Sequence, residues 1–172
     1  MSETAKTRHL TVPYCTGNGL DIGSGGKPVV PWALQIDLPD DKFAAYNSNH
    51  RPESSIQWRG DCRRLPFHPN VFDFVYSSHV LEDFADWKEV VNYWATFVKV
   101  GGHMIIQVPD RVRFAAYIAA GGPPNCAHQH EFLPGELTEH FQRGQPWKII
   151  RDSHTDLPPG DHNILFIAQR LA

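Results

Sequence analysis

The residues near the start of the chain that are best suited to chemistry are a glycine-rich loop and two acids. A short apolar run carries Asp21 and then breaks into a loop that contains Gly23, Ser24 and Gly25. A second apolar run ends in Asp37. Glycines allow a sharp turn after a strand and a close approach of the backbone to a ligand. An acid that ends the neighbouring strand can accept hydrogen bonds from a ribose diol, so the spacing predicts a nucleoside site.

The residues after this loop indicate which nucleoside it holds. A dinucleotide such as NAD requires G-x-G-x-x-G followed directly by a helix, but the sixth position here is Pro28, and Pro31 follows it. At most one helical turn fits before the next strand, which leaves no helix N-terminus to hold a pyrophosphate. S-adenosylmethionine has no phosphate and carries a sulfonium cation. The truncated helix therefore argues against NAD and favours S-adenosylmethionine as the cofactor.

Three stretches of the chain carry a family resemblance. Residues 19–26 resemble motif I of the class I S-adenosylmethionine-dependent methyltransferases. Residues 60–67 and 72–82 resemble the next two motifs of that family in order and spacing. The resemblance extends over roughly residues 14–110 and is strongest to the small type 11-like members, in which the first crossover helix is shortened.

The resemblance implies a cofactor site at the carboxyl ends of four strands, where ligands bind in open α/β sheets. The residues it implies are Asp21, Gly23, Ser24, Gly25, Asp37, Leu38, Asp61, Cys62, Ser77 and His79. Asp21 and the glycine loop would shape the methionine end of the site, and Asp37 would take the ribose hydroxyls. Asp61 would accept from the adenine N6 amine, with the backbone amide of Cys62 near N1.

Two histidines are candidates for catalysis. His79 could orient a substrate or take its proton, because imidazole titrates near neutral pH, or it could be a structural residue bonded to nearby backbone. The resemblance places residues 126–131 in the acceptor pocket, so His130, or alternatively His128, is expected to touch the substrate. This segment holds metal-ligand residue types, but no further ligands are evident and we expect no metal. Glu82 and the adjacent Asp83 are interpreted mainly as acids that start the next helix.

Composition sets limits on the class of protein. The chain has 172 residues, which predicts one domain, with residues 1–12 as a flexible or loosely docked leader. Its 16 basic and 19 acidic side chains form no block of like charge, so we expect no nucleic-acid partner. The three cysteines, Cys15, Cys62 and Cys126, show no paired spacing and indicate a reducing compartment. Without a signal-peptide or membrane-spanning pattern, we expect a cytoplasmic protein with no membrane partner.

Strands alternate with helices along the chain. The strands are expected at 19–22, 32–37, 55–59, 71–77, 103–108, 147–152 and 164–170. The helices are expected at 40–46, 111–120 and 136–142, and in a segment with a capping box at 86–89, apolar residues at helical spacing over 87–98 and Gly101 as its C-cap. This order predicts an open α/β sheet. The resemblance makes it a Rossmann-like, mostly parallel, seven-stranded sheet with an antiparallel last strand and a truncated first crossover helix.

These observations favour a methyltransferase that acts on a small-molecule or saccharide acceptor. A catalytically silent S-adenosylmethionine-binding module is the alternative, because Lys27 and Asp83 replace a glycine and a histidine found in many relatives. An NAD-linked reductase is the third interpretation. It is disfavoured by Pro28 and by the absence of a Tyr-x-x-x-Lys pair after the fifth strand. No sequence pattern sets the oligomeric state.

Overall fold

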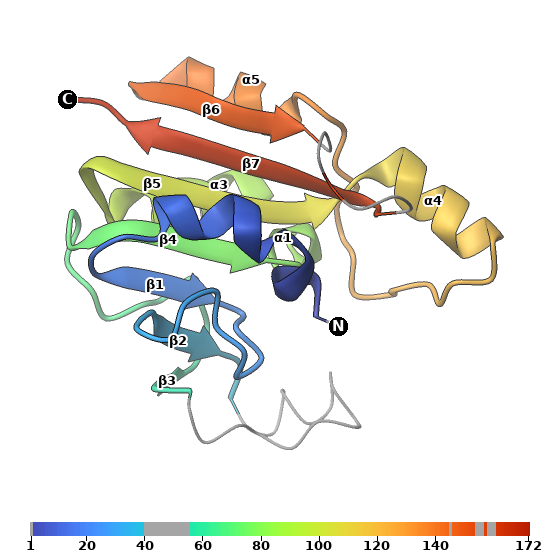
Figure 1. The fold of residues 1–172 in the computed structure, drawn as a ribbon, viewed down its shortest axis with the longest axis horizontal. Coiled ribbons are helices and arrows are strands. Elements are labelled where there is room, and N and C mark those ends of the chain that lie inside the picture. The colour runs from blue at the N-terminus through green and yellow to red at the C-terminus, as the bar shows by residue number, and fades with distance from the viewer. Residues whose placement is uncertain (1, 40–55, 145, 154–156, 158–160) are drawn as a thin grey trace.

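The centre of the computed structural model, which describes residues 2–39, 56–144, 146–153, 157 and 161–172, is a seven-stranded sheet (Figure 1). The strands are β1 (Gly19–Ile22), β2 (Leu34–Asp37), β3 (Trp58–Arg59), β4 (Phe72–Ser78), β5 (Val98–Pro109), β6 (Trp147–Ser153) and β7 (Asn163–Arg170). Their order across the sheet is β3-β2-β1-β4-β5-β7-β6, and only β7 runs antiparallel to its neighbours. The predicted open, mostly parallel sheet with an antiparallel last strand is confirmed.

Helices cover both faces of the sheet. The helical elements are α1 (Glu3–Thr11), η1 (Val12–Tyr14), η2 (Leu81–Asp83), α3 (Trp87–Thr96), α4 (Arg111–Ala119) and α5 (Glu136–Gly144). Helices α3 and α5 share one apolar cluster with the sheet, while α1 lies across the opposite face (Figure 1). Helix α4 projects outward beyond the end of β5, and none of its residues is buried.

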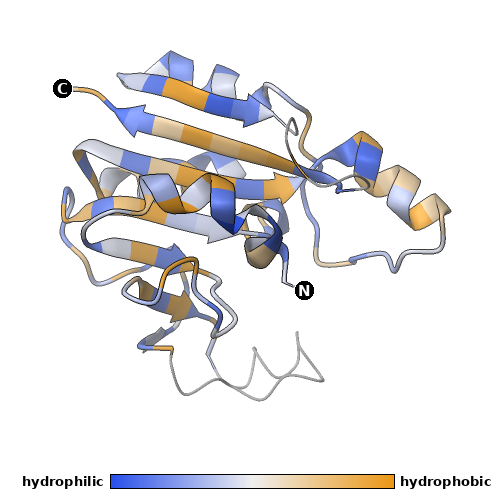
Figure 2. Cartoon of the chain, in the orientation of Figure 1, coloured by the Kyte–Doolittle hydropathy of each residue, from blue (hydrophilic) through white to orange (hydrophobic). Residues whose placement is uncertain are grey.

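The strand sequences explain this two-sided core. Along β7, Ile164 and Phe166 join the cluster under α3 and α5, and Leu165 and Ile167 join the cluster on the face of α1. Successive side chains of a strand point to opposite faces, so a nearly continuous apolar run buries both. Figure 2 shows the apolar residues concentrated in β5 and β7. The long strands β5 and β7 are thus buried on both faces of the sheet.

The N-terminal segment differs from its prediction. Residues 1–12 were expected to form a flexible or loosely docked leader, whereas residues 3–11 form α1. The Ser2 side chain caps the helix by accepting from the Ala5 N–H. Thr7 is fully buried, and its hydroxyl donates to Gln107 Oε1 of β5 at 2.6 Å. The leader prediction is wrong because capping and a polar contact to the sheet order the segment.

Helix α3 also differs from its prediction. The helix ends at Thr96, and the chain enters β5 at Val98, so Gly101 is not a C-cap. Gly101 has φ +81° and lies within β5, where the pairing with β4 shifts register. The Asp86 side chain makes no capping bond, so the predicted capping box does not form.

The connections around β1, β2 and β3 are short. Residues 23–33, between β1 and β2, contain no helix, as the two prolines predicted. The strand expected at 55–59 is reduced to Trp58–Arg59. The helix expected at 40–46 lies outside the described residues. Within the described part of the chain, no helix is both long and apolar enough to cross a bilayer.

Candidate functional site

A cavity of about 490 Å³ lies at the carboxyl ends of β1, β2 and β4. It is closed on one side by the first turn of α1. Seven of the residues predicted from the sequence line it: Gly23, Ser24, Gly25, Asp37, Leu38, Cys62 and His79. The structure therefore brings together, around one space, residues that lie up to 56 positions apart in the sequence.

The Asp37 carboxylate in the cavity wall is held by two backbone N–H groups. Its Oδ2 accepts from the Gly25 N–H at 2.7 Å, and its Oδ1 accepts from the Leu38 N–H at 2.8 Å. The side chain is 9% exposed, and burial raises its pKa although both N–H groups act to lower it. Each carboxylate oxygen keeps a second acceptor site, so Asp37 can still receive hydroxyl donors from a ligand.

The backbone N–H groups of the loop after β1 are bonded to acceptors within the protein. The N–H groups of residues 23–27 all have acceptors within the protein, at 2.7 to 3.4 Å. Their acceptors are the Ile36 carbonyl, the Asp37 carboxylate, and the carbonyl and hydroxyl of Ser24. A phosphate site at such a loop needs several N–H groups aimed at the ligand. The loop therefore lacks the donors that a pyrophosphate requires.

Two glycines of this loop show different constraints. Gly23 has φ +77°, and a Cβ there would lie 2.1 Å from Val80 Cγ2. Gly25 has φ +57°, and a Cβ there would meet no atom within 4 Å. Gly23 thus permits close packing of the loop on the segment after β4, whereas Gly25 leaves open space at the cavity.

Asp21 does not line the cavity, contrary to its predicted place at the methionine end. Its side chain is 1% exposed, and its Oδ2 accepts from the Val29 N–H at 2.6 Å. Burial raises the pKa of Asp21 to about 7, and the bond from Val29 opposes this shift. Asp21 fastens the loop that replaces the first crossover helix, so its contribution to the cavity is indirect.

Asp61 and Ser77 also lie outside the lining. The Asp61 carboxylate accepts from the backbone and side chain of Arg63 at 2.9 to 3.0 Å, and the Arg63 side chain holds its pKa below the usual range. Ser77 is 1% exposed, and the next residue, Ser78, lines the cavity instead, because alternate strand residues point to opposite faces. Cys62 does line the cavity, and burial raises the pKa of its thiol to about 12.

The two candidate catalytic histidines are separated. His79 lines the cavity directly after β4 and adopts φ +56°. His130 does not line it. The His130 Nε2 lies 2.8 Å from Glu136 Oε1, and its ring packs against Trp87 and Phe132. His130 is therefore held between α3 and α5, and its predicted contact with the acceptor is not supported by this geometry.

Sequence reasoning missed the contribution of the N-terminus and of β7. Ser2, Glu3 and Thr4 line the cavity, and Asn163, the first residue of β7, bonds to His79. A signal for the helix was present: Ser2 is a favoured N-cap residue, Glu3 lies in the first turn and Arg8 in the last. The sequence contains no comparable signal for Asn163, because only the folded chain brings it close to His79.

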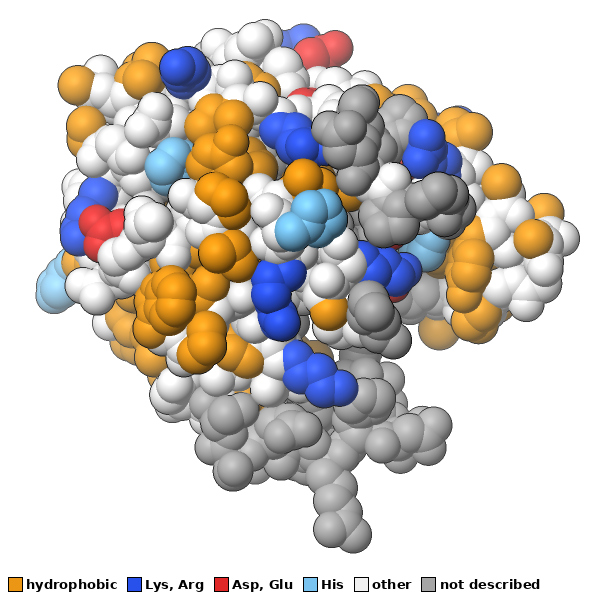
Figure 3. Space-filling model, in the orientation of Figure 1, with side chains coloured by type: hydrophobic (Ala, Val, Ile, Leu, Met, Phe, Trp, Pro, Cys, Tyr) orange, Lys and Arg blue, Asp and Glu red, His pale blue; other side chains and the backbone are white. Residues whose placement is uncertain are grey.

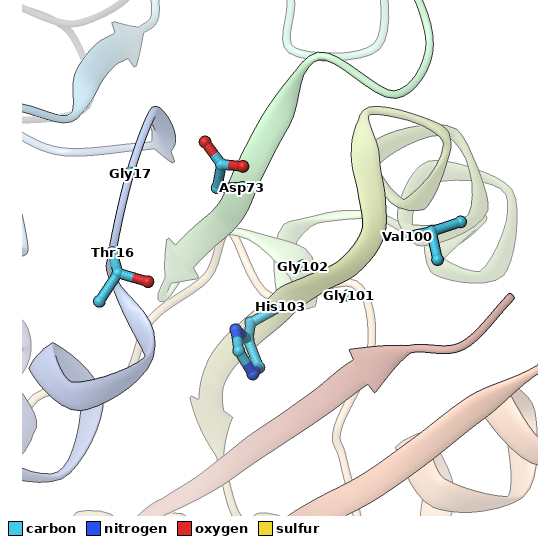
Figure 4. Close-up of a pocket in the computed structure, with 7 residues that line it drawn as sticks. All are labelled: Thr16, Gly17, Asp73, Val100, Gly101, Gly102 and His103. Atoms are coloured by element: carbon cyan, nitrogen blue, oxygen red, sulfur yellow. The ribbon is translucent and has the colours of Figure 1, made fainter.

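A second cavity of about 410 Å³ lies at the opposite edge of the sheet (Figure 4). Its lining residues come from the segment before β1 and from the starts of β4 and β5: Thr16, Gly17, Asp73, Val100, Gly101, Gly102 and His103. Asp73 accepts from the Asn18 N–H and from Lys99 Nζ, both at 2.8 Å. None of the residues predicted to form the site belongs to this lining.

The charge around the first cavity suits a cationic ligand. Among the described residues, three carboxylates (Glu3, Asp37 and Asp83) and one histidine line it, and no lysine or arginine does. On the face shown in Figure 3, lysine and arginine side chains are dispersed among apolar and neutral ones. A sulfonium nucleoside without phosphate fits this lining, since it brings positive charge and needs no phosphate donors.

Comparisons with known proteins agree with the geometry. Residues 20–106 match the family model described as "Methyltransferase domain". The uncharacterized protein MJ1123 of Methanocaldococcus jannaschii is 32% identical over 99 residues, which is 57% of this chain and 47% of that protein. The chain thus spans about half the length of the curated relative that it matches.

Solved structures resemble the whole fold. An S-adenosylmethionine-dependent methyltransferase from Mesorhizobium loti superposes with a TM-score of 0.67 at 17% identity, covering 95% of this chain and 96% of that one. A SAM-dependent methyltransferase from Archaeoglobus fulgidus gives a TM-score of 0.64 at 15% identity, over 97% and 92% of the two chains. At these identities the likeness shows a shared fold.

Proposed function

Because the chain belongs to the methyltransferase domain family, we propose that it is an enzyme that transfers a methyl group from S-adenosylmethionine to a small-molecule or saccharide acceptor. One observation carries the proposal. Asp37 is fixed at the end of β2 by the Gly25 and Leu38 N–H groups, beside a loop whose own donors are used within the protein. This pairing provides an acceptor for ribose hydroxyls and no cradle for a diphosphate, which disfavours the NAD-linked reductase.

The cavity residues have distinct parts in this function. The bound cofactor supplies an electrophilic methyl group on its sulfonium. Asp37 holds the ribose, Gly25 leaves room for the ligand, and the buried Cys62 contributes an apolar wall and a backbone amide. The work of the protein is alignment and exclusion of water, so no nucleophilic triad is required. His79 lies on the same wall as α1, where it orients the acceptor end.

Ligand binding tests the proposal directly. Thermal shift and calorimetry with S-adenosylmethionine, S-adenosylhomocysteine and NAD are expected to show stabilisation by the first two and none by NAD. Stabilisation by NAD alone, or by none of the three, contradicts the cofactor assignment. Transfer of a labelled methyl group to a pool of small amines, phenols and saccharides then tests turnover.

A catalytically silent cofactor-binding module is the second candidate. One observation favours it: both ring nitrogens of His79 already have partners, Glu82 and Asn163. Binding of S-adenosylhomocysteine without any methyl transfer to the pool would select this candidate. In either case we propose a cytoplasmic protein, in keeping with the free thiols of Cys15, Cys62 and Cys126.

A further inference from the structure

A row of polar side chains crosses the cavity wall and joins three distant parts of the chain. Glu82 lies in η2, His79 follows β4, Asn163 begins β7, and Glu3 lies in the first turn of α1. The His79 Nδ1 is 3.2 Å from Glu82 Oε1, and its Nε2 is 2.7 Å from Asn163 Oδ1. Asn163 Nδ2 donates in turn to Glu3 Oε2 at 2.7 Å.

The partners of Asn163 fix the proton on one ring nitrogen of His79. A carboxylate only accepts hydrogen bonds, so the amide nitrogen of Asn163 must face Glu3 and its oxygen must face His79. The amide oxygen is also only an acceptor. The Nε2 of His79 therefore has to carry a hydrogen in order to make the 2.7 Å bond.

Glu82 is the ion-pair partner of the other ring nitrogen. Its side chain is 1% exposed, and its Oε1 lies 3.2 Å from the Nδ1 of His79, although neither carboxylate oxygen completes a hydrogen bond within the described residues. A buried carboxylate without a hydrogen bond is stabilised by positive charge on the ring beside it. With an acceptor at Nε2 and an ion-pair partner at Nδ1, the geometry favours a doubly protonated imidazolium, which has no ring lone pair to receive a proton from a substrate.

The surrounding charges support this protonation state. The charged and titratable groups around His79 are Glu3 and Lys6 of α1, Glu82 and Asp83 of η2, His128 of the loop after α4, and Asp161 and His162 before β7. Burial acts to lower the pKa of His79, but Glu82, with Glu3 and Asn163, more than offsets it and raises the pKa. Burial lowers the pKa of His128 and His162, so these rings stay neutral where His79 is charged.

We propose that Glu82, Asn163 and Glu3 are positioning residues that hold His79 as a cation, so that His79 fastens α1 to the cavity wall and does not act as a base. The charge state of His79 and its link to α1 require no assumption about the reaction. The statement that His79 is not a base rests on the proposed methyltransferase function. It follows that, within the proposed acceptor class, the nucleophile is one whose lone pair needs no proton removal by His79, such as a neutral amine or a thiolate, rather than a saccharide hydroxyl. Attack by that lone pair forms the new bond to the methyl carbon, while the electrons of the broken sulfur–carbon bond return to sulfur.

Nuclear magnetic resonance of the full chain, labelled with ¹⁵N-histidine, tests the protonation state. In a pH titration without ligand, both ring nitrogens of His79 are expected to stay protonated to a higher pH than the rings of His128 and His162, with assignment from His79→Gln. A His79 ring that loses its second proton before those two rings overturns the proposal.

Two variants and a matched control test the partners. Glu82→Gln and Asn163→Ala are each expected to lower the pKa of His79, with the larger shift in Glu82→Gln because Glu82 contributes most to raising it. Asn92→Ala removes the same type of bond elsewhere, since Asn92 Oδ1 lies 2.8 Å from His140 Nε2 on the surface, and it should leave His79 unchanged. A His79 pKa that is insensitive to both network variants rejects their positioning role.

The pH dependence of methyl transfer separates this proposal from the proposed function. If His79 were the base, kcat would fall as the pH drops through the His79 pKa measured by resonance. A fastening cation predicts no loss at that pKa, and any loss then follows the pKa of the acceptor itself. Retained S-adenosylhomocysteine binding in the same samples shows that the cofactor assignment holds even if the profile reveals a base at His79. If the parent protein does not bind S-adenosylhomocysteine, the proposed function is rejected. The charge state of His79 is then decided by the resonance experiment alone.

Discussion

The two edges of the sheet each hold a cavity, an acid and a left-handed glycine, yet they differ in what surrounds these groups. At the carboxyl edge, Asp37 is 9% exposed and is held by two backbone N–H groups. At the amino edge, Asp73 is only partly buried and pairs with Lys99. Gly23 and Gly101 have nearly the same φ, but only Gly23 has a neighbour where a Cβ would stand. The comparison teaches that the burial of the acid and the partners that hold it, rather than residue type, mark the site.

The largest expected effect comes from exchanging glycine for alanine at the two edges. In Gly23→Ala the new Cβ would meet Val80 Cγ2 at 2.1 Å, in addition to the strain of φ +77°. We expect a cost of about 3 kcal/mol, which the protein can relieve by moving the loop away from the cavity. If binding must restore the original loop, the affinity for S-adenosylhomocysteine falls by up to roughly 100-fold in calorimetry. Gly101→Ala carries the same type of backbone strain with open space around it. Gly101→Ala should lower the melting temperature and leave the affinity for S-adenosylhomocysteine unchanged. Equal losses of affinity in Gly23→Ala and Gly101→Ala would show that the two edges of the sheet do not differ in ligand binding.

The second effect compares the two acids. Asp37→Ala removes the acceptor for ribose and the anchor of the Gly25 N–H. A hydrogen bond to a charged acceptor contributes about 1.5–3 kcal/mol, so we expect a tenfold to hundredfold loss of cofactor affinity. Asp73→Ala is the matched control, since its carboxylate also accepts a backbone N–H, that of Asn18, at the opposite edge. If Asp37→Ala bound the cofactor as tightly as the parent protein, Asp37 would not be the residue that holds the ribose.

The third effect concerns stability and pH. The pKa of Asp21 is about 7 in the folded chain against an ordinary value near 3.8, so the folded state keeps this proton longer than the unfolded state. Its contribution to stability is present at low pH and is lost as the pH rises toward 7, by roughly 1.4 kcal/mol per pH unit. Asp21→Asn should therefore unfold with a flatter pH dependence between pH 4 and 7 in urea titrations. In Asp73→Asn, where Lys99 lowers the pKa, the change should have the opposite sign and should appear only below about pH 4, with no change of slope between pH 4 and 7. An unchanged slope in Asp21→Asn would show that the buried acid is not protonated.

The smallest effect is expected at Asp61. Its carboxylate is occupied by Arg63 at the surface, and exposed pairs of this kind contribute about 0–1 kcal/mol. Asp61→Ala should change cofactor affinity less than threefold, well below the effect of Asp37→Ala. A loss above tenfold would mean that Asp61 leaves Arg63 when the cofactor binds, as the resemblance implies.

The features that could be predicted are those encoded within short stretches of sequence. The glycine loop, the prolines that exclude a helix, and Asp37 at a strand end lie within 15 residues. The seven-stranded sheet with an antiparallel last strand followed from the family resemblance. Side-chain directions could not be predicted in the same way. Asp21 turns to Val29 and Asp61 to Arg63, and in each case the competing donor is a neighbour in the loop.

Contacts across long sequence separations were also out of reach. His79 meets Asn163 across 84 positions, and the fold alone brings them together. Helix α1 was missed because the residues that it buries are Thr4, Thr7 and Thr11, which give no apolar stripe. The Gly101 cap was wrong because a left-handed glycine serves a bend in a strand as well as the end of a helix.

The threonine underside of α1 has a consequence for motion. A helix held by hydroxyl contacts and one row of charges buries little hydrocarbon, so it can detach at a smaller free-energy cost than unfolding the central strands. Amide hydrogens of α1 should therefore exchange with solvent sooner than those of β4 and β5. The side of the cavity that α1 closes can then open while the central strands stay folded.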